Sequence, residues 1–335
     1  MKDDTIIEVK NLKTFFYTNQ RCNKAINGVS FKIQKGKTLC IVGESGCGKS
    51  VTAASIMGLL PRLSRIEEGE INYYSKNHGH LRIDQLEQNG PTMRSIRGGE
   101  VAMIFQDPMT ALNPVYTVGS QISENLKYHT KLKRDKIKLK TIDLLSNMGI
   151  PIPEQRAKEY PHQFSGGMRQ RAMIGMAMSC NPQVLIADEP TTALDVTIQA
   201  QIFELMDTLK KDHDTAILLI THDMGVVTEL ADDVAVMYMG NIVESGTIVD
   251  VLRSPAHPYT KALLKSIPIL GKGKSQELEP IKGSTPDPYD RPKGCQFHPR
   301  CEFTTDKCRE VPVDEKISDT HSVMCWHYKE VLKNG

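Results

Sequence analysis

Eight consecutive residues near the start of the chain have the types and spacing of a phosphate-binding loop. They read Gly43-Glu44-Ser45-Gly46-Cys47-Gly48-Lys49-Ser50, after the apolar run 39–42 and before an expected helix from Val51. Glycines let the backbone curl so that successive N–H groups point at a phosphate, and the helix N-terminus adds positive charge. In such a loop Lys49 reaches the β- and γ-phosphates and the Ser50 hydroxyl binds Mg²⁺. The chain is therefore predicted to bind a nucleoside triphosphate with Mg²⁺.

A pair of carboxylates forms the second chemical pattern. Asp188 and Glu189 directly follow the apolar run 184–187, so they stand at the end of an expected buried strand. A nucleotide hydrolase with this kind of loop needs an acid at such a place to hold Mg²⁺, and Asp188 suits that role. Glu189 suits the role of the base that orients and deprotonates the attacking water.

The order of the expected elements predicts an α/β fold. Residues 6–16 and 25–33 alternate like antiparallel strands. Further strands are expected at 39–42, 71–74, 101–105, 184–187 and 216–220, and helices at 51–60, 118–149, 165–180 and 196–211. A strand, phosphate loop and helix followed by further strand–helix alternation indicate a largely parallel sheet. The lysine-rich stretch 131–140 is predicted to be a solvated helical face or an exposed loop.

Composition limits the classes of partner. The 335 residues include 42 Lys and Arg against 40 Asp and Glu, so no strongly basic field indicates a nucleic acid. Apolar residues make up 39% and charged residues 24%, which is typical of a soluble globular protein. No apolar stretch approaches the length of a membrane span, and the N-terminus lacks the apolar region of a signal peptide. We expect a cytoplasmic protein, or one held at a membrane only through a partner.

Three further segments carry a family resemblance. They read Phe164-Ser165-Gly166-Gly167-Met168-Arg169-Gln170-Arg171, Asp188-Glu189-Pro190-Thr191-Thr192-Ala193-Leu194-Asp195 and Thr221-His222-Asp223. Together with the phosphate loop they resemble the ATP-binding-cassette (ABC) ATPases over residues 6–250. The resemblance implies a P-loop NTPase (RecA-like) core with an antiparallel β-subdomain and a helical signature subdomain at about 107–183. It also implies that ATP is hydrolysed between two subunits, with Ser165-Gly166-Gly167 contacting the γ-phosphate held by the opposite subunit.

The same resemblance implies roles for other residues. Residues 43–51 would bind ATP, and Gln106 would contact Mg²⁺ and the attacking water. His222 would contact the γ-phosphate as a second catalytic residue, and Asp195 would lie on the loop that crosses the dimer interface. Phe16, with Tyr17 as the alternative, would stack on the adenine ring.

Residues 254–264, 105–114 and 160–167 narrow the resemblance to the ATPases of oligopeptide and dipeptide importers. This implies a second homologous ATPase subunit, two transmembrane permease subunits, an extracytoplasmic peptide-binding protein and no nucleic acid. The chain would then lie peripherally on the cytoplasmic face of the cell membrane. An importer of nickel or another small solute is the alternative. The single phosphate loop and single signature argue against a soluble ABC ATPase that acts on DNA or ribosomes.

Four of the eight cysteines lie in residues 251–335, which we expect to form a loop-rich extension of a 1–250 nucleotide-binding domain. They are Cys295, Cys301, Cys308 and Cys325. Four thiolates can hold a zinc ion or an iron–sulfur cluster. Their wide spacing suits a cubane better than the close pairs of most zinc sites, and it resembles a [4Fe–4S] site of the peptide-importer ATPases. Zinc and free thiols are the alternatives, whereas disulfides are not expected in a reducing cytoplasm.

Overall fold

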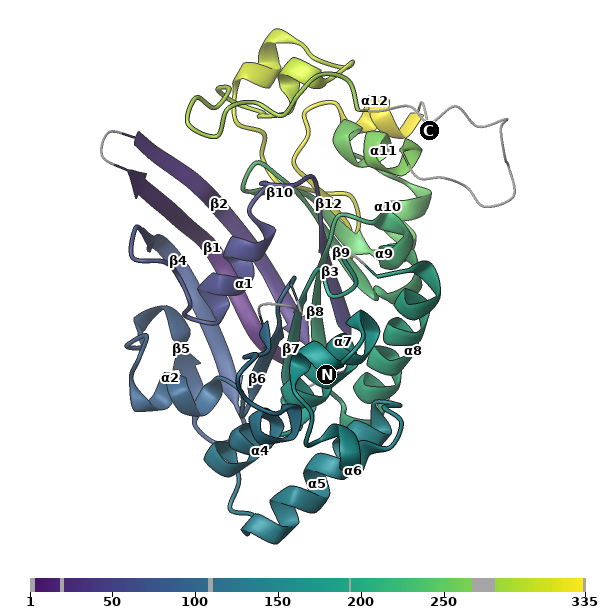
Figure 1. Ribbon diagram of the computed structural model, residues 1–335. Coiled ribbons are helices and arrows are strands. Elements are labelled where there is room, and N and C mark those ends of the chain that lie inside the picture. Colours follow the sequence, from purple (N-terminus) through teal and green to yellow (C-terminus); the bar gives the residue numbers. More distant parts are fainter. Residues whose placement is uncertain (1–3, 19–20, 108–110, 193, 267–280, 334–335) are drawn as a thin grey trace. The chain divides into compact units, whose positions relative to one another are not determined.

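The computed structural model describes residues 4–18, 21–107, 111–192, 194–266 and 281–333 (Figure 1). The parts of the resembling segments at 108–110 and at Ala193 lie outside these residues. The chain divides into two compact units. Unit 1 comprises Met1–Ile6, Ile33–Lys37 and Tyr73–Leu219, and unit 2 comprises Ile7–Lys32, Thr38–Asn72 and Ile220–Gly335. This division does not follow the predicted boundary at residue 250, because unit 2 contains both the phosphate loop and the C-terminal extension.

Long strands form the first sheet of unit 2. β1 (Thr5–Thr18), β2 (Arg21–Gln34) and β4 (Ser64–Ser75) lie in the order β2-β1-β4, and each has one end in unit 1. Alternate residues of β1, including Leu12 and Thr14, are buried. The strands predicted at 6–16 and 25–33 are therefore confirmed, and the strand predicted at 71–74 is the end of the longer β4.

The second sheet of unit 2 carries the phosphate loop. β3 (Thr38–Val42) pairs in parallel with β9 (Asp233–Tyr238), with Val42 opposite Val236. β9 turns through Met239 and Gly240, both at positive φ, into the antiparallel β10 (Asn241–Thr247). Every residue of β3 is buried, as expected of a parallel strand that is covered on both faces. The helix predicted at 51–60 is α1 (Lys49–Ile56), and α9 (Met224–Leu230) packs against β3.

The C-terminal extension contributes strands to the same sheet. β12 (Ser322–Val323) pairs antiparallel with β10, and β11 (Glu315–Lys316) pairs with β12. The sheet order within unit 2 is thus β11-β12-β10-β9-β3. The helices of this part are α10 (Ile248–Arg253), α11 (Pro258–Lys265) and α12 (Tyr328–Lys333), with 3₁₀ turns at His298–Arg300 and Asp306–Arg309 (Figure 1). The extension is rich in loops, as predicted, but it also shares the sheet of the phosphate loop.

Unit 1 contains the other parallel strands. β6 (Val101–Ile104) pairs in parallel with β7 (Val184–Asp188), with Ile104 opposite Ala187. β8 (Ala216–Thr221) lies next to β7, begins in unit 1 and ends in unit 2. β5 (Gly79–Arg82) and α2 (Pro91–Ile96) precede β6. These pairings confirm the predicted α/β core.

Helices fill the middle of unit 1. They are α4 (Val118–His129), α5 (Arg134–Asn147), α6 (Pro153–Arg156), α7 (Gly166–Met178) and α8 (Val196–His213). α4 packs on α5 and α7, and α7 packs on β6. The helical pattern predicted over 118–149 is confirmed, but it forms two helices, α4 and α5, because Thr130 adopts an extended conformation. Within the described ranges, no helix combines the length and apolar character that crossing a membrane requires.

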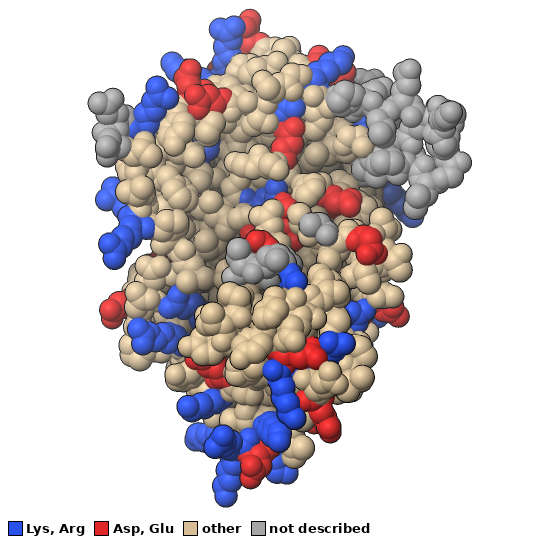
Figure 2. Space-filling model, in the orientation of Figure 1, with Lys and Arg blue, Asp and Glu red and all other residues tan. Residues whose placement is uncertain are grey.

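The lysine-rich stretch around α5 is exposed. Its side chains at Lys133, Arg134, Lys136 and Lys138 face solvent, while Ile137 is buried. Figure 2 shows Lys and Arg side chains gathered over this end of unit 1. This confirms the predicted solvated helical face.

Candidate ATP-binding and hydrolysis site

Two glycines allow the phosphate loop to pass close to neighbouring strands of unit 2. A Cβ atom on Gly43 would lie 2.1 Å from the carbonyl oxygen of Met237 in β9. A Cβ atom on Gly48 would lie 2.4 Å from the carbonyl oxygen of Ala25 in β2, and Gly48 also has a φ of +110°. No larger side chain fits at either position without a backbone shift. The local sequence and the packing thus fix the same tight loop.

Lys49 is folded over this loop. Its Nζ donates hydrogen bonds to the carbonyl oxygens of Gly43 (2.7 Å) and Glu44 (3.1 Å), and the residue is only 5% exposed. The Cys47 thiol is buried beside it, and burial raises the pKa of this thiol although Lys49 acts in the opposite direction. Ser45, Gly46 and Ser50, by contrast, are exposed, and Val51 is half-buried at the start of α1. The arrangement offers backbone N–H groups and one ammonium to an anion.

The two aromatic residues proposed for adenine differ in their surroundings. Tyr17 is engaged within its own sheet, since its hydroxyl donates to Glu67 and the Arg65 guanidinium lies 4.7 Å from its ring centroid. Phe16 lies on the opposite face of β1, the face of Thr14. The Thr14 hydroxyl contacts the Ser55 hydroxyl of α1 at 3.1 Å. Phe16 is half-buried and shares its face with the helix that follows the phosphate loop, which favours Phe16 over Tyr17.

In unit 1, the parallel pairing of β6 and β7 brings two of the predicted site residues together. The Gln106 amide Nε2 donates a hydrogen bond of 3.0 Å to Oε2 of Glu189, and the Thr192 hydroxyl donates to the same oxygen at 3.1 Å. Asp188, the last residue of β7, is 5% exposed. Glu189 has a φ of +47°, a left-handed conformation that costs a residue with a Cβ atom about 1 kcal/mol or more. Strain of this kind is typical of functional sites.

The signature segment lies at the start of α7. Ser165 is the N-cap, and its hydroxyl accepts a hydrogen bond from the Met168 N–H at 3.3 Å. Asp195 caps α8 in the same manner through the Ile198 N–H at 2.9 Å. Ser165, Gly166, Gly167 and Asp195 line one pocket of about 500 Å³ within unit 1. The structure therefore brings together two segments that the sequence separates by about thirty residues.

His222 follows β8 in unit 2. The Thr221 hydroxyl accepts from the Asp223 N–H at 3.0 Å, and Asp223 caps α9 by accepting from the Gly225 N–H at 2.7 Å. These two bonds hold the backbone on both sides of His222, whose side chain is exposed. The turn therefore presents an imidazole to solvent at the end of a buried strand.

Sequence reasoning missed one set of contacts at the phosphate loop. The Arg300 guanidinium pairs with the Glu44 carboxylate through two contacts, Nη1–Oε2 at 2.7 Å and Nη2–Oε1 at 3.1 Å. The Tyr259 hydroxyl accepts a hydrogen bond from the Glu44 N–H at 2.8 Å. Both partners belong to the extension, more than two hundred residues along the chain. No local pattern in the sequence links positions this far apart.

The four cysteines of the extension lie within electrostatic range of one another. Burial raises the pKa of Cys301 to about 11 and that of Cys325 to about 12, and the neighbouring cysteines raise both further. The Cys295 N–H also donates to the Cys308 carbonyl at 2.9 Å. Among the described residues, however, no three His, Cys, Asp or Glu side chains are arranged to hold a metal ion. The predicted metal site is therefore not supported by the arrangement of these side chains.

Comparisons with known proteins agree with this geometry. The model of the ABC transporter family matches residues 26–192, and that of the oligopeptide/dipeptide transporter C-terminal region matches residues 243–308. The chain is 50% identical over 325 residues to the dipeptide transport ATP-binding protein DppD of Bacillus subtilis, covering 96% of this chain and 95% of DppD. It is 49% identical over 328 residues to the oligopeptide transport ATP-binding protein AppD of the same organism, covering 97% and 98%.

Solved structures share the fold. The dimeric ATP-binding cassette MJ0796 bound to ADP and Pi matches with a TM-score of 0.63 at 24% identity, over 72% of this chain and 99% of that one. The protein cbiO1 of Clostridium perfringens matches with a TM-score of 0.59 at 26% identity, over 75% and 91%. The phosphate loop, the signature and the full-length identity together establish that this chain belongs to the ABC transporter ATP-binding proteins, in the group that carries the oligopeptide/dipeptide transporter C-terminal region.

Proposed function

We propose that this chain is the ATP-hydrolysing subunit of an importer for dipeptides or oligopeptides. The observation that carries the proposal is identity of about half over nearly the whole chain to dipeptide and oligopeptide transport ATP-binding proteins, including the C-terminal region. The phosphate loop and the Gln106–Glu189 pair supply the chemistry that such a subunit needs. Peptide import is favoured over nickel import because both relatives are named for peptide transport.

Each site residue has a role in this proposal. Within residues 43–51, backbone N–H groups other than that of Glu44, which Tyr259 binds, hold the phosphates together with the Lys49 ammonium, and Phe16 stacks on adenine. Ser50, Asp188 and Gln106 carry hydroxyl, carboxylate and amide oxygens, which are the donors that Mg²⁺ prefers. Mg²⁺ neutralises phosphate charge when it is bound.

Glu189 takes the proton of the attacking water, and Gln106 holds its carboxylate in place through the 3.0 Å hydrogen bond. His222 donates to the γ-phosphate oxygens. Loss of the γ-phosphate removes these contacts, so hydrolysis is coupled to the opening of the site.

The subunit would act with partners. Ser165-Gly166-Gly167 and Asp195 line one pocket, which supports a surface that completes the ATP site of a second, homologous ATPase subunit. Two permeases and an extracytoplasmic binding protein would complete the importer, with this chain on the cytoplasmic face of the membrane. Within this assembly, residues 1–250 would form the nucleotide-binding domain that hydrolyses ATP, and residues 251–335 would form its C-terminal extension.

A [4Fe–4S] cluster on Cys295, Cys301, Cys308 and Cys325 is the finer part of the proposal. Four buried or half-buried thiols within mutual electrostatic range support it. The described side chains form no group of three that could hold a metal ion, so a cluster or a zinc ion would require these thiols to move closer together. The cluster would stabilise the extension, since no electron partner is evident nearby.

The test is purification of the assembly. The tagged chain is extracted from membranes, the co-purifying subunits are identified, and uptake is measured in vesicles with labelled peptides and with labelled nickel. Peptide uptake that requires ATP and is lost in the Lys49→Ala variant supports the proposal. ATP hydrolysis without co-purifying permeases, or uptake of nickel alone, contradicts it.

A further inference from the structure

The C-terminal extension holds the phosphate loop through contacts to Glu44. Its carboxylate accepts from both terminal nitrogens of Arg300, and its Oε2 also accepts from the Thr285 hydroxyl at 3.4 Å. Its backbone N–H is bound by the Tyr259 hydroxyl. Glu44 is the second residue of the loop and carries a negative charge where the loop must receive phosphates. The loop therefore contains an anion that its own segment does not neutralise.

The Arg300 side chain is buried and is held in position for this contact by further hydrogen bonds. Its side chain is 4% exposed, and its other donors reach the carbonyl oxygens of Lys282 and Gly283 at 2.9 and 3.3 Å. Its guanidinium also lies near the Tyr238 and Phe297 rings. Burial lowers the pKa of Arg300, but the hydrogen bonds with Glu44 and Tyr238 raise it more, so the charge is held. A buried, bidentate pair of this kind has both strength and fixed geometry.

Tyr259 is equally fixed. It is fully buried, and its ring packs on Tyr238 at 4.7 Å and on Phe297 at 5.4 Å between centroids. Tyr238 belongs to β9, the strand beside β3, so these rings join the extension to the sheet that carries the loop. The hydroxyl that binds the Glu44 N–H therefore stands on a rigid support.

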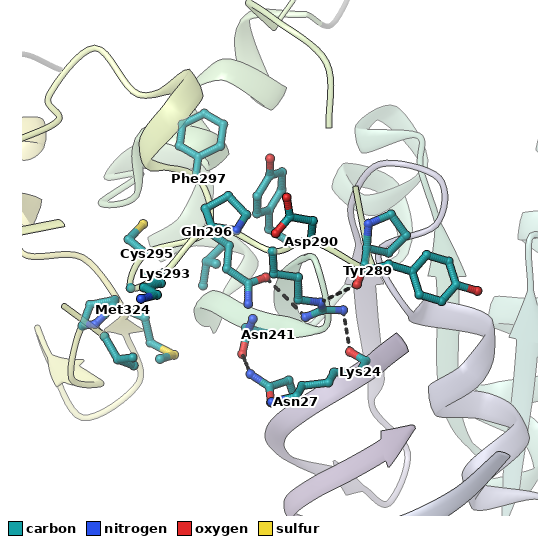
Figure 3. A pocket seen from close by; sticks show the side chains of 18 of the residues that line it. Lys24, Asn27, Asn241, Tyr289, Asp290, Lys293, Cys295, Gln296, Phe297 and Met324 are labelled. Atoms are coloured by element: carbon teal, nitrogen blue, oxygen red, sulfur yellow. Dashed lines mark hydrogen bonds between the residues drawn. The ribbon is translucent and has the colours of Figure 1, made fainter. Parts of the chain in front are cut away.

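A second connection reaches the loop through the β9–β10 turn. Arg291 donates to the carbonyl oxygens of Met239 (2.6 Å) and Lys24, and it lines a pocket of about 450 Å³. Lys24 and Tyr289 line the same pocket (Figure 3). Gly240, which follows Met239 in this turn, donates its N–H to the carbonyl oxygen of Cys47 in the phosphate loop at 2.7 Å. The extension thus holds the β9–β10 turn, and this turn is hydrogen-bonded to Cys47 in the middle of the phosphate loop.

We propose that Arg300 and Tyr259 are positioning residues of the ATP site, through which the extension neutralises and orients Glu44 and so sets the affinity for nucleotide. The inference rests on the proposed function, since it concerns the same ATP site. If Arg300 loses its charge, an unpaired carboxylate stands beside the incoming phosphates. If Tyr259 loses its hydroxyl, the Glu44 N–H loses its acceptor and the start of the loop is released.

The experiment measures the Kd for MgATP by calorimetry on the purified full-length chain. Arg300→Met keeps the apolar stem against the aromatic rings and removes the guanidinium, with its charge and its hydrogen bonds to Glu44, Lys282 and Gly283. It is expected to weaken ATP binding about tenfold, and Tyr259→Phe by a smaller factor. Glu44→Gln is expected to tighten binding, and Arg300→Met combined with Glu44→Gln to recover most of the loss. Arg309→Met, at an exposed arginine of the same extension, is the matched control.

The recovery in the double variant separates a charge effect from a packing effect. Equal loss of affinity in Arg300→Met and in the double variant would overturn the proposal, as would unchanged affinity in Arg300→Met. If Arg300→Met does not fold, the ATP affinity of Glu44→Gln alone tests the proposal. An affinity for ATP that is unchanged or weaker than that of the wild type then overturns it. Lys49→Ala separates the two levels of inference. If it binds ATP normally, the proposed function fails, whereas if only Arg300→Met binds normally, this inference alone fails.

Discussion

The Gln106 amide donates a hydrogen bond to the Glu189 carboxylate across the ends of the parallel strands β6 and β7. Glu189 itself has a left-handed φ of +47°, and the Thr192 hydroxyl is a second donor to its carboxylate. A carboxylate with two donors on one oxygen keeps its orientation but retains lone pairs for a water. This geometry suits a general base that must be in position before the water arrives.

The first prediction follows from this contact. Glu189→Gln should bind ATP normally and lose hydrolysis by about 10²- to 10⁴-fold, because the amide cannot accept the proton of the water. Phosphate release and ATP affinity are measured in parallel. Glu204→Gln, at an exposed carboxylate of α8, should behave like the wild type. Near-normal turnover in Glu189→Gln would show that Glu189 is not the general base.

The second prediction concerns the signature. The chain alone at low concentration should hydrolyse ATP slowly, and its rate per molecule should rise with concentration or with added partner subunit. The reason is that Ser165-Gly166-Gly167 is proposed to serve the ATP of the opposite subunit. The rate is measured over a dilution series with a size measurement at each point. A full, concentration-independent rate in a strict monomer would refute the composite site.

The third prediction tests the packing of the phosphate loop. Gly43→Ala should lower the free energy of unfolding by on the order of 3 kcal/mol, since its Cβ atom would stand 2.1 Å from the Met237 carbonyl oxygen. Gly79→Ala, where the Cβ atom meets open space but φ is +69°, should cost only about 1 kcal/mol. Denaturant titrations compare the two, and equal costs would show that the loop can move away from β9.

The fourth prediction concerns pH. Burial lowers the pKa of His257 from 6.5 to about 4, although Glu244 acts in the opposite direction. At pH values between these limits the unfolded chain binds a proton that the folded chain does not. Stability from this group is therefore complete above pH 6.5 and is lost as the pH falls toward 4. Between pH 6.5 and 5 the loss should be about 1–2 kcal/mol.

Denaturant titrations of wild type and His257→Asn at several pH values provide the measurement. Asparagine keeps an N-cap acceptor for the Tyr259 N–H, which His257 now binds through Nδ1 at 3.0 Å, but it does not titrate. The variant should show a shallower decline of stability with falling pH. Parallel declines would assign the pH dependence to other groups.

The fifth prediction concerns the cysteines. Protein purified without oxygen should be brown and contain about four iron atoms per chain, and Cys301→Ser should lose them. Because Cys301 follows Arg300 directly, loss of the cluster should also weaken ATP binding. If the protein contains one zinc ion per chain and no iron, the site binds zinc and the cluster assignment is wrong. If it contains neither metal and the thiols react freely, both metal assignments are wrong.

The sequence predicted the local parts of the site because each is a short motif at the end of one element. The loop 43–50, the acids at the end of β7 and the signature at the start of α7 all lie where the pattern places them. What it could not predict depends on pairing between distant segments. β11 and β12 are two residues long, too short for any periodicity, and their partner β10 lies about eighty residues earlier. Thr130 ends α4 through its backbone conformation, which the surrounding helical pattern conceals.

The choice between Phe16 and Tyr17 shows the same limit. Both are aromatic and adjacent, and both lie in β1, so residue type cannot separate them. The faces of β1 separate them, because Thr14 contacts Ser55 of α1 on one face and Glu67 binds Tyr17 on the other. Strand parity is visible in the sequence, but which face meets the helix is decided only by the fold.

The pairing of β12 with β10 has a consequence for biosynthesis. Residues 322–323 pair with β10 in the sheet that holds the phosphate loop of residues 43–50, so this edge of β10 has no native partner until these residues have been synthesised and have left the ribosome. Until then, β10 remains an open edge that can pair with another polypeptide, and Glu244 lacks the His321 that contacts it at 2.8 Å in the folded protein. Nascent chains should therefore depend on chaperones until residues 321–323 have emerged, and chains truncated before residue 321 should yield insoluble product.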